Sequence, residues 1–144
     1  VAVMNEGKIH QIDTPINLLN NPKTLFVSSF ILGNNIINLE KNGNSYISCL
    51  GEINCSEYLK NTGIKSMSIS PKFISIKRSE SGDAIVISKE FLGEFLIYKV
   101  SINGNILRVR TDINNLLNNG DKCSLSINKN SYYFLYPGAY KEYI

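Results

Sequence analysis

Residues 1–33 read VAVMNEGKIHQIDTPINLLNNPKTLFVSSFILG and carry the clearest local signals in the chain. Two apolar runs, residues 1–4 and 8–12, flank an Asn-Glu-Gly turn sequence at residues 5–7. The glycine of this turn can take the positive φ that a tight connection between antiparallel strands requires. We therefore predict a β-hairpin at the start of the chain.

A short helix is expected directly after the hairpin. Thr14 supplies an N-cap hydroxyl, and Pro15 suits the first helical position. Pro22 ends this helix because proline cannot continue one. Its apolar face would consist of Ile16, Leu18 and Leu19.

A second helix is predicted over residues 23–32, because apolar side chains again recur at helical spacing. Gly33 then closes it as a C-terminal cap. The apolar stripe of this helix would consist of Leu25, Phe26, Ser29 and Phe30.

After Gly33 the hydrophobic period changes from helical to alternating, and Gly-Asn turn sequences recur. This pattern is typical of a small β-barrel or sandwich, so we place a domain boundary between residues 32 and 33. Strands are expected at residues 36–39, 46–49, 67–69, 74–76, 96–102, 107–109, 123–127 and 132–136, with a single helical turn at 56–61. The first two of these strands would flank a turn at residues 42–44, and residues 96–109 would form a hairpin.

Size and composition favour one main domain. The chain has 144 residues, of which 43% are apolar and 19% charged, enough for one sizeable core. Its longest apolar-rich run, residues 24–32, is far shorter than the roughly 20 residues of a membrane-spanning helix. No signal-peptide pattern opens the chain, so we expect a soluble protein that is not exported. The net charge of +3 is spread along the chain and predicts neither a nucleic-acid nor a membrane partner.

The cysteine and histidine content argues against a metal centre. Cys49, Cys55 and Cys123 are odd in number and form no CxxC pair, which suits reduced thiols in a cytosolic protein. His10 is the single histidine of the sequence. We therefore expect no metal-binding residues.

Several short pieces of residues 1–31 occur in an order that resembles the ATP-binding subunits of ABC importers. They are Val1-Ala2-Val3-Met4-Asn5-Glu6-Gly7-Lys8-Ile9, Thr14-Pro15, Asn21-Pro22, Phe26-Val27 and Phe30-Ile31. The resemblance implies that residues 1–32 are the C-terminal end of a nucleotide-binding domain, beyond its switch histidine. It also implies that residues 33–144 form a TOBE-type regulatory domain, an OB-like small β-barrel. The expected fold is thus mostly β, with the barrel preceded by a β-hairpin and two short helices.

The later part of the chain is similar to this family at fewer positions, chiefly in residues 91–94 and 120–121. Where many relatives carry Arg-Pro-Glu, this chain has Ser70-Pro71-Lys72, which reverses the local charge pattern, so no contact is carried over for that loop. The positions that match the family pattern are Asn5, Glu6, Gly7, Thr14, Pro15, Pro22, Phe26, Phe30, Gly33, Gly93, Gly120 and Asp121.

The sequence lacks the motifs with which this family hydrolyses ATP. Hydrolysis needs a glycine-rich phosphate loop with its lysine, a Walker B acid and a signature motif. Gly7-Lys8 has neither the upstream glycine nor the following hydroxyl residue of a phosphate loop. We therefore expect no catalytic residues and no cofactor in this chain, and we assign ATP and Mg²⁺ to the longer parent protein of which it would be a fragment.

The resemblance also implies partners and a location. Paired C-terminal domains of this family hold two ATPase subunits together, so we expect a homodimer through residues 33–144. The parent would associate with membrane-spanning permease subunits at the cytoplasmic face of the membrane. Iron, polyamine and sugar are the candidate solutes. The expected function is regulation and dimerisation in an importer's ATP-binding subunit.

A different function class stays open, namely a stand-alone OB-like module that binds a small anion or single-stranded nucleic acid. Its stacking platform would be an aromatic cluster, with charge from Arg108, Arg110 and Lys141. The cluster consists of Tyr132, Tyr133, Phe134, Tyr136, Tyr140 and Tyr143. Alternating aromatics in a last strand more often fill a core or an interface, and the small net charge gives little attraction for a polyanion.

An enzyme is the least favoured class. Asp83, Glu90, Glu94 and Asp112 lie beside turns or strand edges, and no spacing brings two of them together for acid/base work. A Cys55 nucleophile would need a base, and the single histidine lies in a different predicted unit.

Overall fold

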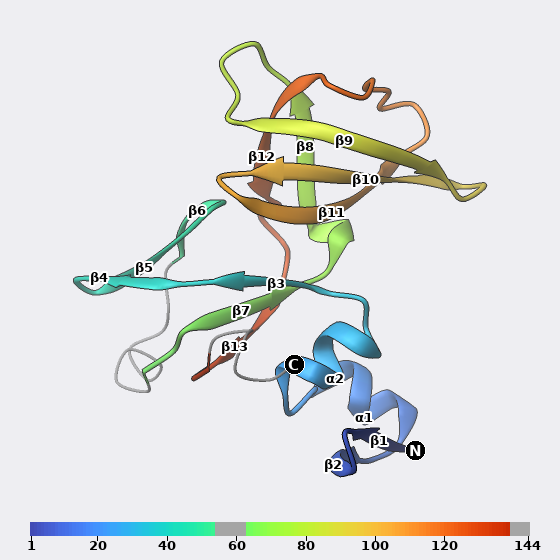
Figure 1. Cartoon of the computed structure of the whole chain (residues 1–144), viewed down its shortest axis with the longest axis vertical. Coiled ribbons are helices and arrows are strands. Elements are labelled where there is room, and N and C mark those ends of the chain that lie inside the picture. The colour runs from blue at the N-terminus through green and yellow to red at the C-terminus, as the bar shows by residue number, and fades with distance from the viewer. Residues whose placement is uncertain (54–62, 139–144) are drawn as a thin grey trace. The chain divides into compact units, whose positions relative to one another are not determined.

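The computed structural model describes residues 1–53 and 63–138, and it is mostly β with two short helices (Figure 1). Its contacts divide the chain into two compact units. The first unit comprises Val1–Ser48, Glu52–Ser70 and Tyr133–Ile144, and the second comprises Cys49–Gly51 and Pro71–Tyr132. The mostly β fold class is confirmed. None of the helices in the described residues has the length and apolar character needed to span a membrane.

The first unit opens with the predicted hairpin. Strands β1 (Ala2–Asn5) and β2 (Lys8–Ile12) pair antiparallel, with a register irregularity after Val3. Glu6 and Gly7 both take positive φ, 49° and 76°, as a tight hairpin turn requires.

Both predicted helices are present. In α1 (Pro15–Asn20) the Thr14 hydroxyl accepts a bond from the Asn17 N–H at 3.2 Å, as predicted for an N-cap. Helix α2 (Leu25–Phe30) has a similar cap in Thr24, which was not among the predicted caps. Gly33 takes φ 67°, and its N–H donates to the Ser29 carbonyl at 3.1 Å, which closes the helix as expected.

The predicted apolar faces of these helices are correct only in part, for Leu18 in the first helix and Leu25 in the second. Helix α1 buries Leu18, whereas Ile16 and Leu19 are more than half exposed. Helix α2 buries its Leu25, Val27, Ser28 side and leaves Phe30 exposed. The reason is that α2 packs on strands β3 (Asn35–Asn38) and β7 (Ser66–Ile69) through the small Ser28 side chain, which permits close approach.

Strand β7 lies between β3 and β13 (Tyr133–Tyr136) in an antiparallel three-stranded sheet. All four residues of β7 are buried, so the predicted alternation of buried and exposed residues is wrong here. Helix α2 contacts this strand and its Ser28 bonds to Ser68, so the serine side of β7 is buried as well.

A second three-stranded sheet has the order β4 (Glu40–Asn42), β5 (Ser45–Ser48), β6 (Gly51–Ile53). The turn expected near residues 42–44 joins β4 to β5, whereas β3 pairs with β7. The predicted helical turn at residues 56–61 lies outside the described residues.

The second unit is a five-stranded antiparallel sheet of order β11-β10-β9-β12-β8, preceded by a 3₁₀ turn at Pro71–Phe73. Its strands are β8 (Ile74–Arg78), β9 (Ala84–Phe91), β10 (Phe95–Ile102), β11 (Asn105–Asp112) and β12 (Lys122–Ile127). The β10–β11 hairpin is as predicted, while β9 was not foreseen.

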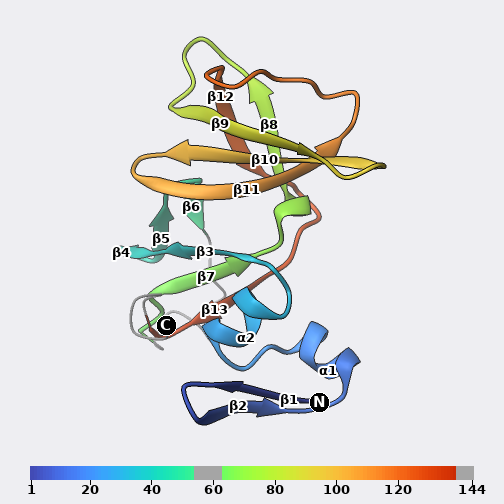
Figure 2. The same cartoon turned by 45° about the vertical axis from the view of Figure 1, so that its right-hand side comes forward.

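This sheet is strongly curled. Strands β8 and β12 cross the direction of β9, β10 and β11 in both views (Figures 1 and 2). The two edge strands, β8 and β11, contact each other, and the 3₁₀ turn also contacts β11. Within the described residues no ladder joins these edges, so no closed barrel is detected.

Candidate functional site

The hairpin at the start of the chain has an apolar side chain on each face. On the inner face Val3 pairs with Gln11, and Val3 packs with Leu18 and Val27. On the outer face Met4 pairs with Ile9, and each is more than half exposed, at 57% and 58%. We call Ala2, Met4, Ile9 and Ile12 the outer hairpin face.

An aromatic stack joins the hairpin to helix α2. The His10 ring lies 4.8 Å from that of Phe26, which stacks on Phe30 at 5.3 Å. The His10 Nδ1 atom is 3.1 Å from the Thr24 hydroxyl. Phe30 ends the stack with 69% of its surface exposed. The family-matching positions Phe26 and Phe30 thus form a partly exposed aromatic pair.

Buried polar contacts connect residues 1–32 to the sheet β13-β7-β3. Ser28 and Ser68 are fully buried and bonded to each other, and the Asn34 amide donates to Ser68 at 3.0 Å. The Tyr136 hydroxyl donates to the Pro22 carbonyl at 2.7 Å. Burial raises the pKa of Tyr136 to about 12. The predicted boundary at residue 33 stays a prediction, and the chain on its two sides packs together in the first unit.

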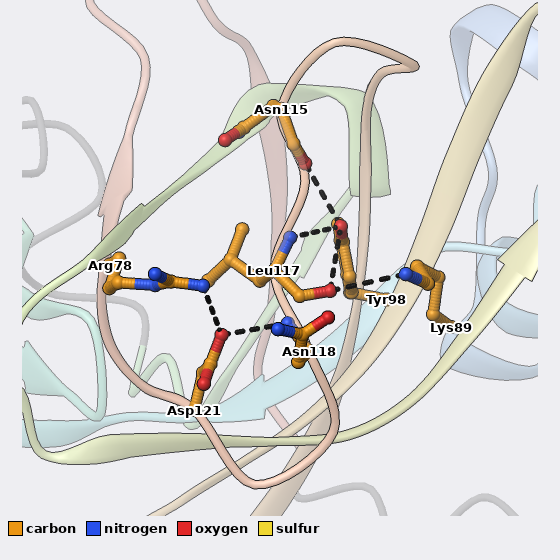
Figure 3. A network of polar contacts seen from close by, with 7 residues as sticks. All are labelled: Arg78, Lys89, Tyr98, Asn115, Leu117, Asn118 and Asp121. Atoms are coloured by element: carbon orange, nitrogen blue, oxygen red, sulfur yellow. Dashed lines mark hydrogen bonds and ion pairs between the residues drawn. The ribbon is translucent and has the colours of Figure 1, made fainter.

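In the second unit, a polar network holds the loop between β11 and β12 (Figure 3). The buried Tyr98 hydroxyl donates to the Asn115 carbonyl at 2.9 Å and accepts from the Leu117 N–H at 2.8 Å. The Lys89 ammonium donates to the Leu117 carbonyl at 3.3 Å. The backbone N–H and carbonyl of Leu117 therefore both have hydrogen-bond partners, and the Leu117 side chain is buried.

The same loop ends in two of the family-matching positions. The Gly120 N–H donates to the Val86 carbonyl at 2.7 Å, with φ 89° at the glycine. The Asp121 carboxylate accepts from the Asn118 N–H and from Arg78, both at 2.7 Å. The Asn118 bond, followed by Arg78, holds the pKa of this carboxyl below its usual range. This arrangement fixes the end of the loop.

The other family-matching positions are structural in their contacts. Gly93 takes φ 86° in the turn between β9 and β10, where the Leu92 N–H donates to the Phe95 carbonyl at 3.0 Å. Residues 5–7, Thr14 and Gly33 shape the turn and helix ends described above. The structure therefore spreads the matching positions over both units and brings no single cluster together.

Of the acids considered for catalysis, Glu90 and Asp112 lie in strands, and neither is opposite another acid in the sheet register. Ile97 lies opposite Glu90, and Phe95 lies opposite Asp112. In the described part of the chain, no group of three or more His, Cys, Asp or Glu side chains could hold a metal ion.

The environment of the two described cysteines favours the protonated thiol. Burial raises the pKa of Cys49 and of Cys123, which favours the neutral thiol over the nucleophilic thiolate. Cys55 lies outside the described residues.

The described members of the aromatic cluster near the C-terminus are divided between the two units. Tyr132 belongs to the second unit and packs edge-on against Phe73 at 4.8 Å. Tyr136 belongs to the first unit and is buried. Tyr140, Lys141 and Tyr143 lie outside the described part.

Several contacts were missed by sequence reasoning. Tyr98 shows in the sequence only as one more apolar residue in an alternating strand, and nothing local marks its hydroxyl as a loop anchor. The Ser28–Ser68 pair joins residues 40 positions apart, so no local pattern signals it.

Comparison with known proteins gives partial matches. A 47-residue match, 33% of this chain, is 53% identical to the spermidine/putrescine import ATP-binding protein PotA of Bacillus anthracis and covers 14% of that protein. A 37-residue match to PotA of Desulfitobacterium hafniense is 57% identical, over 26% of this chain and 11% of that protein. A longer match of 86 residues, 58% of this chain, is 35% identical to the sn-glycerol-3-phosphate import ATP-binding protein UgpC 3 of Agrobacterium fabrum, of which it covers 24%.

These matches span less than a quarter of the length of each of the three relatives. No protein-family model matches the chain. The matches nevertheless include two kinds of import ATP-binding protein. They agree with the resemblance to such subunits that residues 1–31 show in the sequence. The chain is therefore related, over part of its length, to the ATP-binding subunits of ABC importers, and it resembles their C-terminal region.

Proposed function

We propose that this chain acts as the non-catalytic C-terminal region of an ABC importer's ATP-binding subunit, with a role in regulation and dimerisation. ATP and Mg²⁺ would be held by the nucleotide-binding core of that subunit, and this chain supplies no phosphate loop. The subunit would associate with membrane-spanning permease subunits at the cytoplasmic face. Polyamine is the solute favoured by the PotA matches, with sugar and iron as alternatives.

The observation that carries the proposal is the outer hairpin face. A two-stranded hairpin with apolar side chains on both sides is suited to lie between two packed layers. The described residues supply the inner layer through Val3, Leu18 and Val27. Met4, Ile9 and Ile12 would be covered by the nucleotide-binding core, and burying each half-exposed side chain would contribute on the order of 1 kcal/mol.

The second unit supports the regulatory part of the proposal. Five antiparallel strands in a curled sheet, with edges β8 and β11 in contact, agree with an OB-like, partly open barrel of the TOBE type. Such a domain on each of two subunits would keep the pair associated while the nucleotide-binding faces open and close.

A complementation experiment tests the proposal. PotA of Bacillus anthracis, shortened to lack the segment that this chain matches, is mixed with this chain, and association is followed by size-exclusion chromatography. We expect co-elution that is lost in Ile9→Asp, because a carboxylate cannot be buried against an apolar core. Ile47→Asp, at an exposed position of β5, is the matched control and should co-elute.

Absence of co-elution for the unchanged chain would contradict the proposal, as would equal loss in both variants. An ATPase assay on this chain alone gives a second readout. Magnesium-dependent hydrolysis by the purified chain would overturn its assignment as non-catalytic.

A further inference from the structure

Three Asn-Gly pairs occur in the chain, at residues 42–43, 103–104 and 119–120. Each lies where one strand turns towards the next, and all three asparagines are exposed. The first two pairs are each followed by another asparagine, so the tripeptides at residues 42–44 and 103–105 are identical. A difference in reactivity between these two asparagines therefore comes from the structure around them.

An asparagine that precedes glycine can lose its side-chain amide without an enzyme. The glycine backbone nitrogen gives up its proton and attacks the asparagine Cγ atom, so that a C–N bond forms and the amide nitrogen leaves as ammonia. Water then opens the cyclic imide at one of its two carbonyls, which gives aspartate or isoaspartate. Glycine favours ring closure because it has no Cβ atom to hinder it. The reaction needs a glycine N–H that is free to lose its proton and a backbone that can rotate.

The structure opposes this reaction at Asn119. The Gly120 N–H donates to the Val86 carbonyl at 2.7 Å, so the attacking nitrogen is already engaged. By contrast, within the described part of the chain the N–H groups of Gly43 and Gly104 donate no hydrogen bond. Asn42 and Asn103 are therefore the two candidates.

Asn103 lies in a turn that is firmly held. Its flanking strands, β10 and β11, pair along all eight residues of each strand. Val100 and Leu107 lie opposite each other in this ladder and are buried. The Asn105 side-chain amide also donates to the carbonyls of Ile102 and Asn103, both at 3.3 Å. Rotation of the backbone here would need a long, half-buried hairpin to open.

Asn42 lies in a turn that is held much less. Strands β4 and β5 pair through three residues, and every residue of β4 is exposed. Strand β4 can thus separate from β5 without exposing apolar surface of its own. An exposed bond from the Ser45 hydroxyl to the Asn42 carbonyl, at 3.1 Å, restrains the turn. Short exposed ladders of this kind open locally at a small cost in free energy.

We propose that Asn42 is a site of spontaneous deamidation in the folded chain, whereas Asn103 and Asn119 are protected. This inference does not depend on the proposed function. The product places a carboxylate two residues from Glu40, on the same side of β4, and isoaspartate also adds a carbon atom to the backbone. Both changes weaken the pairing of β4 with β5, so the reaction irreversibly alters the charge and pairing of this sheet.

The test incubates the folded chain in mildly alkaline buffer and follows the conversion of amide to acid by peptide mass spectrometry. Trypsin cleaves after Lys and Arg, so the three pairs fall in separate peptides, residues 42–60, 100–108 and 111–122. We expect Asn42 to react at least about tenfold faster than Asn103, with Asn119 slowest. In urea the rates of Asn42 and Asn103 should agree to within about twofold, because unfolding leaves only their identical tripeptides.

Two variants locate the reaction and its control. Asn42→Ser should abolish the mass change in the peptide of residues 42–60. Ser45→Ala removes the bond to the Asn42 carbonyl and should speed the reaction about threefold. Equal rates for Asn42 and Asn103 in the folded chain would overturn the proposal. A rate difference that persists unchanged in urea would also overturn it, because the fold would then not be its cause.

Discussion

At the scale of single residues, Gly82 lies directly against the backbone of β12. A Cβ atom at this position would lie 2.1 Å from the Cys123 carbonyl oxygen and 2.4 Å from its carbonyl carbon. Both neighbours are backbone atoms in a strand that pairs with β8 and β9, so they cannot rotate away. The requirement for glycine here is a matter of space and not of dihedral angle.

We therefore expect Gly82→Ala to destabilise the second unit by about 1–3 kcal/mol, as overpacking does. Thermal unfolding followed by circular dichroism measures the loss. Glu80→Ala, at an exposed neighbouring position, is the control and should leave the midpoint nearly unchanged. Equal midpoints for Gly82→Ala and the unchanged chain would show that the loop at Gly82 can move away from β12 to admit a methyl group.

At the scale of elements, the buried Tyr98 hydroxyl bonds to the backbone of the loop between β11 and β12 at Asn115 and Leu117. Removing it in Tyr98→Phe leaves the buried Leu117 N–H without that partner. We expect a loss of about 1–3 kcal/mol in the free energy of unfolding, measured by urea titration.

Tyr46→Phe is a matched control for this prediction. Tyr46 is equally buried, but its hydroxyl has no hydrogen-bond partner in the described part of the chain. Removing that hydroxyl should be neutral or stabilising. If both variants lose the same stability, the Tyr98 bonds do not hold the loop.

The elements that sequence reasoning predicted correctly are those with local signals. The Asn-Glu-Gly turn, the Thr14 cap and the Gly33 helix end are each specified within a few residues. The pairing of β3 with β7 was missed because the two strands are about thirty residues apart and compete with the nearby β5. The buried side of α2 was misjudged because a small serine, and not the phenylalanine pair, faces the sheet.

For the candidate site, the sequence predicted which residues match a family pattern but not the contacts that those residues make. Residues 1–31 match the family pattern closely enough to indicate relatives, but the contacts that give those residues a role are non-local. Tyr136 bonds to Pro22, 114 positions away in the sequence. Met4 and Ile9 are exposed because the opposite face of the hairpin, which carries Val3, packs on Leu18 and Val27. Burial of this kind cannot be deduced from periodicity in short elements.

At the scale of the whole molecule, the proposed dimer predicts self-association of this chain through residues 33–144. Light scattering over a range of concentrations should show a mass that rises towards twice that of the monomer. Met4→Asp/Ile9→Asp makes the outer hairpin face acidic and should not change this result. If the double variant is monomeric, the association arises from the exposed hairpin, and the dimer through the second part of the chain loses its support.

The first unit is also discontinuous in sequence. Strand β13 pairs with β7, but residues 71–132 of the second unit lie between these two strands in the sequence. On the ribosome, the curled sheet of the second unit therefore emerges complete while the first unit still lacks its last edge strand. Until Tyr136 is synthesised, one edge of β7 has open backbone groups and the Pro22 carbonyl lacks its tyrosine donor. We therefore expect the second unit to fold before the first unit is complete. The bond from Tyr136 to Pro22 would be among the last contacts to form.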